Sequence, residues 1–395
     1  MKLRYSILLL GFCACFIPKT NAQNYDELIR EVISSNPEIA ISTASNRSEL
    51  MSIKSENNLP DPELEFEHQW GQHNIGNKWA ISLSQSFEWP GTYNVRSNAF
   101  KTTSKAIAYL DRSNYIDKQL EIKLLFIDIV NIHKNMALTN EVMEHMSQLK
   151  AKYHQGYELG EVSLLDVNKI DIEHIAISRK YNDLEIQLNT LKSSLSAIAG
   201  GNDCSNIISK LTEYPQDKLL SEEEYTKLIA ETDPQLSYSS LMAQAQALNL
   251  KAAKLGMMPG FSLGYIHNYE LGERFNGLKI GISLPLFSTK NKTKAAQFLQ
   301  ESYDLQTTAL HVNKLTSMYS ERTNIVRLNR EIQQSKPIFE KSDNLLLLKK
   351  ALDGGEISLL NYLQEVNYFL SAQQDYMNIV YQYHYALARL NKYTL

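Results

Sequence analysis

The stretch LGEVSLLDV, at residues 159–167, returns as GGEISLLNY at residues 354–362 of this 395-residue chain. Both copies place a glycine before Glu, a branched apolar residue, Ser and two leucines. Glycine accepts left-handed backbone conformations, so Gly156 and Gly160 in one region and Gly354 and Gly355 in the other are predicted to let the chain reverse between two long helices. Two copies of one turn indicate an internal duplication.

Other features also occur twice, in the same order. Asn36-Pro37 at the start of one helical segment is matched by Asp233-Pro234 at the start of another. We therefore predict two repeats of one plan, in which a helix is followed by a strand hairpin and a long helical hairpin. The first repeat spans 23–210, with its strand hairpin over 62–88 and its helical tip near 156–166. The second spans 211–395, with its strand hairpin over 260–287 and its tip near 353–361.

Four segments alternate between apolar and polar residues. The first is PELEFEHQW at residues 62–70, where Leu, Phe, His and Trp point one way and Glu and Gln the other. A period of two predicts a strand, because successive side chains lie on opposite faces of a sheet. Strands of about ten residues, the length of a tilted transmembrane strand, are expected at 62–72, 77–88, 260–269 and 276–287.

A soluble sheet packed on helices would alternate in the same way. Strand length, an export signal and tryptophans near the strand ends favour a membrane barrel instead. A band of aromatic residues at the membrane surface is predicted at Trp70, Trp79, Trp89, Tyr265 and Tyr269. His68 and His267 hold matching places beside these residues and are interpreted as part of the same band.

The predicted strands also require partner chains. Open strand edges are not tolerated in hydrocarbon, because each unpaired backbone group costs several kcal/mol. Four strands are too few to close a barrel. The sequence therefore predicts an oligomer.

The helices are expected to be long. Residues 95–153 and 289–336 contain neither Pro nor Gly. At a rise of 1.5 Å per residue, each could form a rod on the order of 70–90 Å long. Between residues 362 and 390, apolar residues recur every seven positions in three columns. This pattern predicts left-handed coiled-coil packing with neighbours on both sides, as in a sheet of helices closed into a tube.

The N-terminus has the pattern of an export signal. Basic Lys2 and Arg4 precede a short apolar run, and small residues end at Ala22, so residues 1–22 are predicted to be a signal peptide. Lipidation of Cys15 is an alternative, because the residues around it resemble a lipoprotein cleavage box. Cys204 is the one cysteine beyond this segment, which excludes an intramolecular disulfide in the mature chain. Forty Lys and Arg against 44 Asp and Glu do not favour a nucleic-acid partner.

The duplicated plan, LPDPELEFE at 59–67 and the paired turns resemble the TolC-type outer-membrane efflux ducts. The resemblance implies a mainly α fold with a small membrane β-barrel, in which a homotrimer closes a twelve-stranded barrel above a helical tunnel. It implies location in the outer membrane of a Gram-negative bacterium, with the tunnel in the periplasm and lipid around the barrel. A periplasmic adaptor and an inner-membrane pump, of the RND type that moves metal cations or drugs, would be the partners. The chain would conduct passively, with no cofactor and no enzymatic step.

The resemblance also implies roles for the two turns. Contacts with the adaptor are expected at Gly160, Glu161, Val162, Gly355, Glu356 and Ile357. A constriction of the tunnel is expected at Asp166, Lys169, Asn361, Gln364 and Glu365. The second repeat departs from the family pattern because Asn361 and Gln364 are neutral where acidic gate residues occur in the best-known members. Strong block by multivalent cations is therefore not expected.

The main alternative function is that of an exported coiled-coil scaffold or adhesin, although such a protein would not require four alternating strands. An enzyme finds no support, since the chain lacks a Ser nucleophile elbow, an HExxH motif, a phosphate-binding glycine loop and a CxxC pair. Asp171 and His174 are spaced like metal ligands on a helix, but a carboxylate-bridged site needs a second such pair. No metal site is predicted.

Overall fold

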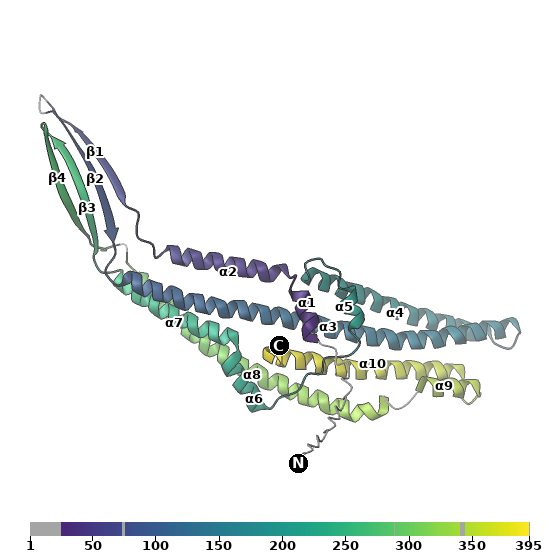
Figure 1. The fold of residues 1–395 in the computed structure, drawn as a ribbon. Coiled ribbons are helices and arrows are strands. Elements are labelled where there is room, and N and C mark those ends of the chain that lie inside the picture. The colour runs from purple at the N-terminus through teal and green to yellow at the C-terminus, as the bar shows by residue number, and fades with distance from the viewer. Residues whose placement is uncertain (1–24, 73–75, 288, 340–343, 395) are drawn as a thin grey trace, which may run out of the picture.

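The computed structural model describes residues 25–72, 76–287, 289–339 and 344–394. The predicted signal peptide at 1–22, with Cys15, lies outside these residues. The molecule is elongated, with a four-stranded sheet at one end and two helical turns at the other (Figure 1). Between them run long helices that lie roughly side by side.

The two halves of the chain have corresponding elements in the same order. The first half contains α1 (Tyr25–Ile33), α2 (Pro37–Ser55), β1 (Glu63–Trp70), β2 (Asn77–Phe87), α3 (Thr92–Glu158), α4 (Leu164–Ile198) and α5 (Ser205–Lys210). The second contains α6 (Glu222–Thr232), α7 (Pro234–Leu255), β3 (Gly260–Glu270), β4 (Glu273–Ser283), α8 (Lys292–Phe339), α9 (Asn344–Asp353), α10 (Leu359–Leu390) and the 3₁₀ turn η1 (Lys392–Thr394). A boundary between the repeats at 210/211 stays a prediction.

The helix starts follow local sequence. Asn36 caps α2 by accepting a hydrogen bond from the Ile39 amide at 3.0 Å. Asp233 caps α7 by accepting one from the Gln235 amide at 2.8 Å. Each cap precedes a proline at the first helical position. An N–H group at this position would have no partner within the helix, so proline, which has no N–H, loses no hydrogen bond there. The matched Asn-Pro and Asp-Pro pairs thus begin matching helices.

Helix α3 is longer than predicted, whereas α8 has the expected 48 residues but begins and ends three residues later. Helix α3 has 67 residues, or about 100 Å at 1.5 Å per residue. Helix α8 was expected to end at Lys336, but it continues through Pro337 to Phe339. Proline so near the C-terminus removes few helical hydrogen bonds, and the Phe339 ring stacks on Tyr376 of α10 with centroids 5.1 Å apart. No helix in the described part of the chain is both long and apolar enough to cross a membrane.

The strands form an antiparallel sheet in the order β1-β2-β3-β4. Leu64 lies opposite Leu83, which in turn faces Tyr265, and Tyr265 faces Leu278. One apolar face therefore runs unbroken across all four strands.

Two predicted boundaries in the second hairpin are wrong. A loop was expected at 270–275, but strand pairing continues to Glu270 and Glu273, and only Leu271 and Gly272 form the turn. Both turn residues have positive φ, 49° and 85°, which suits the twist of a two-residue hairpin. Strand β4 was expected to reach 287 but ends at Ser283, because Pro285 has no N–H for the ladder. The corresponding loop in the first hairpin falls partly on 73–75, outside the described residues.

The buried core lies in the helical part. One cluster joins α1, α3, α4 and α5 around fully buried Phe126. A second joins α3, α4, α9 and α10 toward the two turns, and a third joins α6, α8 and α10. The helical hairpins are thereby packed against each other.

Candidate functional site

One face of the sheet is apolar and exposed. Leu64 is 75% exposed, Leu278 78% and Ile280 76%, values that are unusual for large aliphatic side chains. Among the described residues no element covers this face (Figure 1). An exposed apolar patch of this kind marks a surface that meets another protein or a membrane.

The opposite face is polar and concave. Lys279 on β4 reaches Glu65 on β1, with Nζ and Oε2 3.5 Å apart, although β2 and β3 lie between these strands. Small residues occupy the space beneath the pair, including buried Ser82 and Gly264. A Cβ added at Gly264 would lie 2.9 Å from the Ser84 Cβ. The sheet therefore curls toward its polar side.

The predicted aromatic band divides between the two ends of the sheet. Trp79 stacks on Tyr269 at 5.8 Å near the hairpin ends, and Trp70 lies there too, 80% exposed. Trp89 lies at the opposite end, where its ring is 5.8 Å from that of Phe261. Tyr265 sits in the middle of β3, where its hydroxyl bonds to Asn276 at 2.6 Å. These tryptophans therefore mark the two ends of the sheet, about one strand length apart.

The two helical turns are near copies of each other. Gly160 and Gly355 have φ values of 76° and 72°, a conformation that favours glycine. At both turns the next amide bonds back to the helix: Glu161 to the Gly156 carbonyl and Glu356 to the Ala351 carbonyl, each at 2.9 Å. Each helix therefore ends at a glycine in the left-handed conformation, and the chain reverses tightly after it.

Serine then starts the following helix at both turns. The Ser163 hydroxyl accepts a bond from the Asp166 amide at 3.2 Å. The Ser358 hydroxyl accepts one from the Asn361 amide at 3.3 Å. The Gly and Ser of the repeated motif therefore give both turns the same backbone conformation.

Gly156 and Gly354 do not reverse the chain, contrary to the sequence-based interpretation. Neither has a positive φ. Gly156 is instead a buried helical residue, and a Cβ there would lie 2.7 Å from Val162 Cγ2. It provides room for Val162 to fold back on α3.

The turns also expose leucines that sequence reasoning missed as functional candidates. Leu159 is 67% exposed, Leu165 71% and Leu360 50%. The repeated Ser-Leu-Leu of the two motifs was the available signal. These leucines add apolar side chains to the outer surface of the turns, beside the exposed carboxylates of Glu161 and Glu356.

The predicted constriction residues lie on two helices. Asp166 on α4 accepts a bond from the Ser163 hydroxyl at 2.7 Å and pairs with Lys169 at 3.0 Å. Both contacts hold the pKa of the Asp166 carboxyl below its usual value, and the hydrogen bond from Ser163 has the larger effect. Asn361, Gln364 and Glu365 are exposed on α10. No hydrogen bond or ion pair in the described structure joins the α4 group to the α10 group.

The two helical hairpins that carry the turns are tied together. Lys152 of α3 pairs with Asp353 of α9 at 2.7 Å, and Asn367 of α10 donates to Glu173 of α4 at 2.6 Å. The turns therefore lie at one end of the molecule as a pair (Figure 1).

Asp171 and His174 do not share a site. Asp171 instead contacts His154 at 3.1 Å and Lys150 at 3.1 Å, while His174 bonds to the Ser147 hydroxyl at 3.0 Å. Within the described ranges, no group of three or more His, Cys, Asp and Glu side chains could hold a metal ion.

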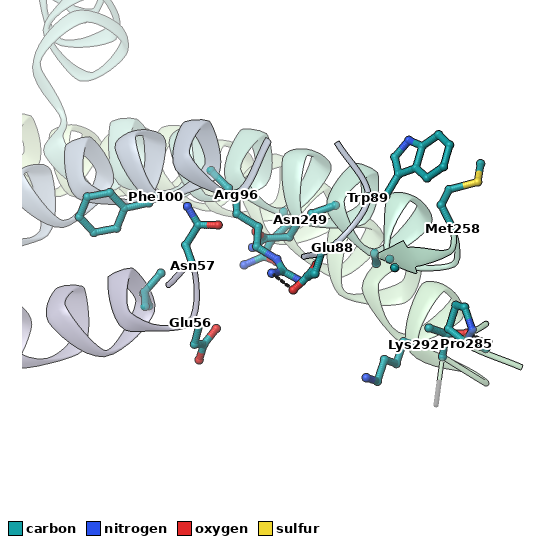
Figure 2. Close-up of a pocket in the computed structure, with 18 of the residues that line it drawn as sticks. Glu56, Asn57, Glu88, Trp89, Arg96, Phe100, Asn249, Met258, Pro285 and Lys292 are labelled. Atoms are coloured by element: carbon teal, nitrogen blue, oxygen red, sulfur yellow. Dashed lines mark hydrogen bonds and ion pairs between the residues drawn. The ribbon is translucent and has the colours of Figure 1, made fainter. Parts of the chain in front are cut away.

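A cavity of about 820 Å³ lies where the sheet joins the helices (Figure 2). Helices α2, α3, α7 and α8 and the ends of β2, β3 and β4 line it. An ion pair between Arg96 and Glu88 at 2.6 Å crosses its wall. The sequence did not predict it, because its lining comes from segments far apart in the chain.

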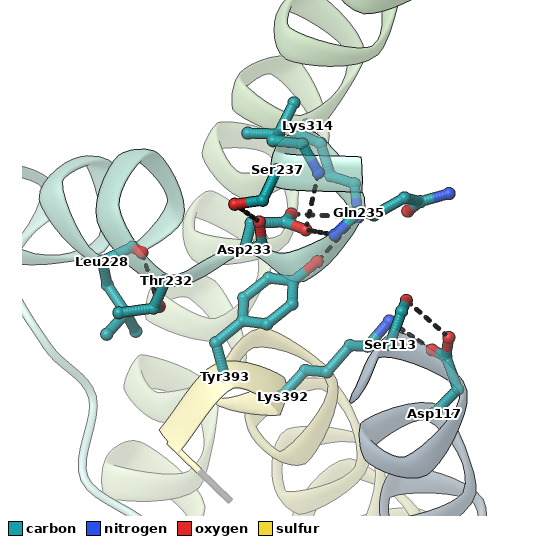
Figure 3. A network of polar contacts seen from close by, with 11 residues as sticks. Ser113, Asp117, Leu228, Thr232, Asp233, Gln235, Ser237, Lys314, Lys392 and Tyr393 are labelled. Atoms are coloured by element: carbon teal, nitrogen blue, oxygen red, sulfur yellow. Dashed lines mark hydrogen bonds and ion pairs between the residues drawn. The ribbon is translucent and has the colours of Figure 1, made fainter. Parts of the chain in front are cut away.

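A buried polar network fixes the C-terminal segment (Figure 3). Lys314 of α8 lies 3.2 Å from the fully buried carboxylate of Asp233 and donates to the Tyr393 hydroxyl at 2.6 Å. Burial, and secondly the hydrogen bond with Asp233, raise the pKa of Tyr393. Lys392 pairs with Asp117 of α3. The network connects α3, α8 and the start of α7 with the C-terminal turn η1.

No protein-family model and no curated protein matches the sequence. Solved structures match the fold. The CmeC outer membrane channel of Campylobacter jejuni is 17% identical, with a TM-score of 0.72 over 94% of this chain and 85% of that one. VceC, an outer membrane protein of Vibrio cholerae, is 14% identical, with a TM-score of 0.74 over 93% and 95%. The open state of the MtrE outer membrane channel of Neisseria gonorrhoeae is 13% identical, with a TM-score of 0.72 over 93% and 88%.

These similarities extend along nearly the whole of each chain. The protein thus has the TolC-type fold, with long helices and a four-stranded sheet, and the resemblance drawn from the sequence is confirmed for the fold.

Proposed function

We propose that the chain is one third of an outer-membrane exit duct, and that three copies close a twelve-stranded barrel above a helical tunnel in the periplasm. The observation that carries this proposal is the exposed apolar face of the sheet, backed by a concave polar face. In a closed barrel the apolar face meets lipid and the polar face lines a water-filled opening. Solved outer-membrane channels with the same fold support this reading.

Closure needs other copies of the chain. Strands β1 and β4 are the edges of the sheet, and each has one side without a strand partner in the described structure. Such edges are not tolerated in hydrocarbon, whereas the edge of a second copy would pair them. This requirement supports an oligomer, and the fold shared with solved outer-membrane channels supports three copies.

The duct conducts passively and has no enzymatic step or cofactor. Substrates reach it from an inner-membrane pump, of the RND type, through a periplasmic adaptor. The adaptor meets the turns at Gly160, Glu161, Val162, Gly355, Glu356 and Ile357. Exposed leucines beside these residues, such as Leu159 and Leu360, support a docking surface there that combines apolar and acidic side chains.

The tunnel narrows at the constriction formed by Asp166, Lys169, Asn361, Gln364 and Glu365. In three copies, the exposed polar residues of α4 and α10 would form rings around the axis. Because Asp166 pairs with Lys169 within each chain, its negative charge is already partly compensated. The ring would therefore attract multivalent cations weakly.

Ion conductance in planar lipid bilayers tests the proposal. Purified protein should insert and give discrete single-channel steps, because the polar face encloses water. An exported scaffold or adhesin, the alternative function, would be released without detergent and would give no steps. Absence of conductance from correctly folded, inserted protein would contradict the duct.

A further inference from the structure

The helix ends nearest the sheet carry exposed lysines on one side. Helices α2 and α7 end, and α3 and α8 begin, toward the sheet (Figure 1). Near these ends lie six exposed lysines that together form the basic band: Lys54, Lys101, Lys105, Lys251, Lys254 and Lys294.

The basic band faces away from the cavity where the sheet joins the helices. In α7, Met242, Gln246 and Asn249 line that cavity. At about 3.6 residues per turn, Lys251 and Lys254 project from the other side of the helix. On α2, α3 and α8 the same spacing separates the lysines of the band from the residues that line the cavity.

The cavity itself lies on the concave, polar side of the molecule. Ser86, Glu88 and Ser283 line it. Along the strands they alternate with Phe87 and Ile282, which belong to the apolar face of the sheet. The basic band therefore lies on the convex side, in continuity with the apolar face.

Acidic residues do not balance the basic band. Helix α7 contains no Asp or Glu, and the first acidic residues of α3 and α8 are Asp111 and Glu301. In the part of the chain that the structure describes, no lysine of the band forms an ion pair or a hydrogen bond through its ammonium group. At the opposite end of the sheet, by contrast, Lys78 pairs with Glu270 at 2.9 Å.

Exposed apolar residues lie between the sheet and the basic band. Leu59, Met257, Leu284 and Leu286 are exposed in the segments that join the strands to the helices. Trp89, at this end of the sheet, lies beside Phe261 of the apolar face. Apolar, aromatic and then basic residues follow one another in the same way at a membrane surface, where Trp lies at the level of the headgroups and lysine stems extend to them.

We propose that the basic band binds the phosphate groups of anionic phospholipids, such as phosphatidylglycerol, in the membrane leaflet next to the helices. The negative headgroup complements the unpaired ammonium groups, and the acyl chains continue along the apolar face of the sheet. The inference rests on the proposed duct function because that function places the sheet in a bilayer.

Quenching of tryptophan fluorescence by brominated lipids tests this inference. Trp70→Phe with Trp79→Phe leaves Trp89 as the one tryptophan, at the end of the sheet next to the band. The full chain is reconstituted into phosphatidylcholine bilayers that contain increasing fractions of brominated phosphatidylglycerol or brominated phosphatidylcholine. Phosphatidylglycerol should bind beside Trp89 about five-fold more strongly, as expected for one lysine near an anionic headgroup. High salt should weaken this preference, because it screens exposed charges.

Lysine variants locate the effect. In the same background, Lys101→Gln, Lys251→Gln, Lys254→Gln and Lys294→Gln together should make the two lipids bind about equally. The matched control combines four exposed positions remote from the sheet that change the net charge equally: Lys210→Gln, Lys218→Gln, Lys227→Gln and Lys350→Gln. It should keep the preference. Should the first quadruple variant not insert, the double variant Lys251→Gln, Lys254→Gln takes its place, with Lys218→Gln, Lys227→Gln as its control.

Equal quenching by the two brominated lipids would overturn the inference, as would a preference that salt does not weaken or equal preferences of the band variant and its control. Conductance distinguishes this failure from failure of the duct. Channels that conduct but show no lipid preference leave the duct intact and remove the lipid site. Absence of quenching by either lipid would contradict the membrane barrel and this inference with it.

Discussion

Leu83 and Ser84 are adjacent in β2 and point to opposite faces of the sheet. Leu83 belongs to the exposed apolar face, at 51% exposure, and Ser84 to the concave polar face. If the apolar face meets lipid, Leu83→Arg should cost roughly 2–4 kcal/mol near the membrane midplane. Ser84→Arg should be tolerated, because its long side chain reaches water. Heat stability of the oligomer extracted from membranes measures both, and equal effects of the two changes would contradict the assignment of faces.

Buried His384 should make the stability of the helical core fall in acid. Burial lowers its pKa to about 4 and outweighs the opposing effect of Asp217. Its ring stacks on Tyr214 at 4.6 Å, and its Nδ1 is buried without a hydrogen-bond partner in the described structure. The unfolded chain, with a pKa of about 6.5, binds this proton first as the pH falls. Stability from His384 is therefore complete above about pH 6.5 and declines toward about pH 4, by at most roughly 1.4 kcal/mol per pH unit.

The variant His384→Phe keeps the stacked ring and removes the titration. Its apparent unfolding temperature should fall less than that of the wild type between about pH 7 and about pH 5. Circular-dichroism melts in detergent measure this, and His311→Phe, at an exposed position, is the control. Identical pH dependence in all three proteins would show that His384 does not contribute.

Single residues were predictable where one short-range rule decides their position. Alternation placed Leu83 and Ser84 on opposite faces, and the repeated motif identified Gly160 and Gly355. Gly156 was misassigned because composition does not reveal which nearby glycine takes a positive φ. That depends on how Val162 folds back onto α3, a contact absent from the local sequence.

At the scale of elements, the turns provide the sharpest test of the adaptor contact. Substituting Gly160 and Gly355 by Leu strains a left-handed backbone by roughly 1–2 kcal/mol at each turn and adds bulk at the surface. We expect oligomers to assemble while efflux of a pump substrate is lost. Gly201→Leu is a matched control, because Gly201 also has a positive φ, 89°, and open space around it. Efflux that survives the double change would reduce the turns to a structural role.

The constriction makes a separate prediction for α10. Truncating Asn361 and Gln364 to Ala should widen the ring and raise single-channel conductance. The matched pair Asn182→Ala and Gln187→Ala, exposed on α4 beyond the turn, should leave conductance unchanged. Equal conductance of the wild type and the α10 variant would place the narrowest point elsewhere.

The elements themselves were largely readable from the sequence. Long runs without Pro or Gly predicted α3 and α8, and alternation predicted four strands. The turn at Leu271 and Gly272 was missed because leucine rarely adopts a left-handed conformation. The cavity was missed because its walls come from four helices and three strand ends, which no single stretch of sequence brings together.

At the scale of the whole molecule, many apolar side chains have no cover within one chain. Besides the sheet, exposed residues include Ile172 and Ile186 on α4 and Leu347 on α9, at 66%, 64% and 59%. Helices α4 and α9 are therefore surfaces where neighbouring copies of the proposed oligomer should pack. Sequence periodicity predicted that the helices have neighbours on both sides, but it does not state which neighbours belong to another chain.

One chain, with both edges of its sheet unpaired in the described structure, is an incomplete part of the proposed duct. Native mass measurement of the protein extracted in mild detergent tests this most directly. We expect a single species with three times the mass of the mature chain, because the edges of the β1–β4 sheet need other copies and the proposed twelve-stranded barrel contains three. A stable monomer that keeps its helical content would contradict it.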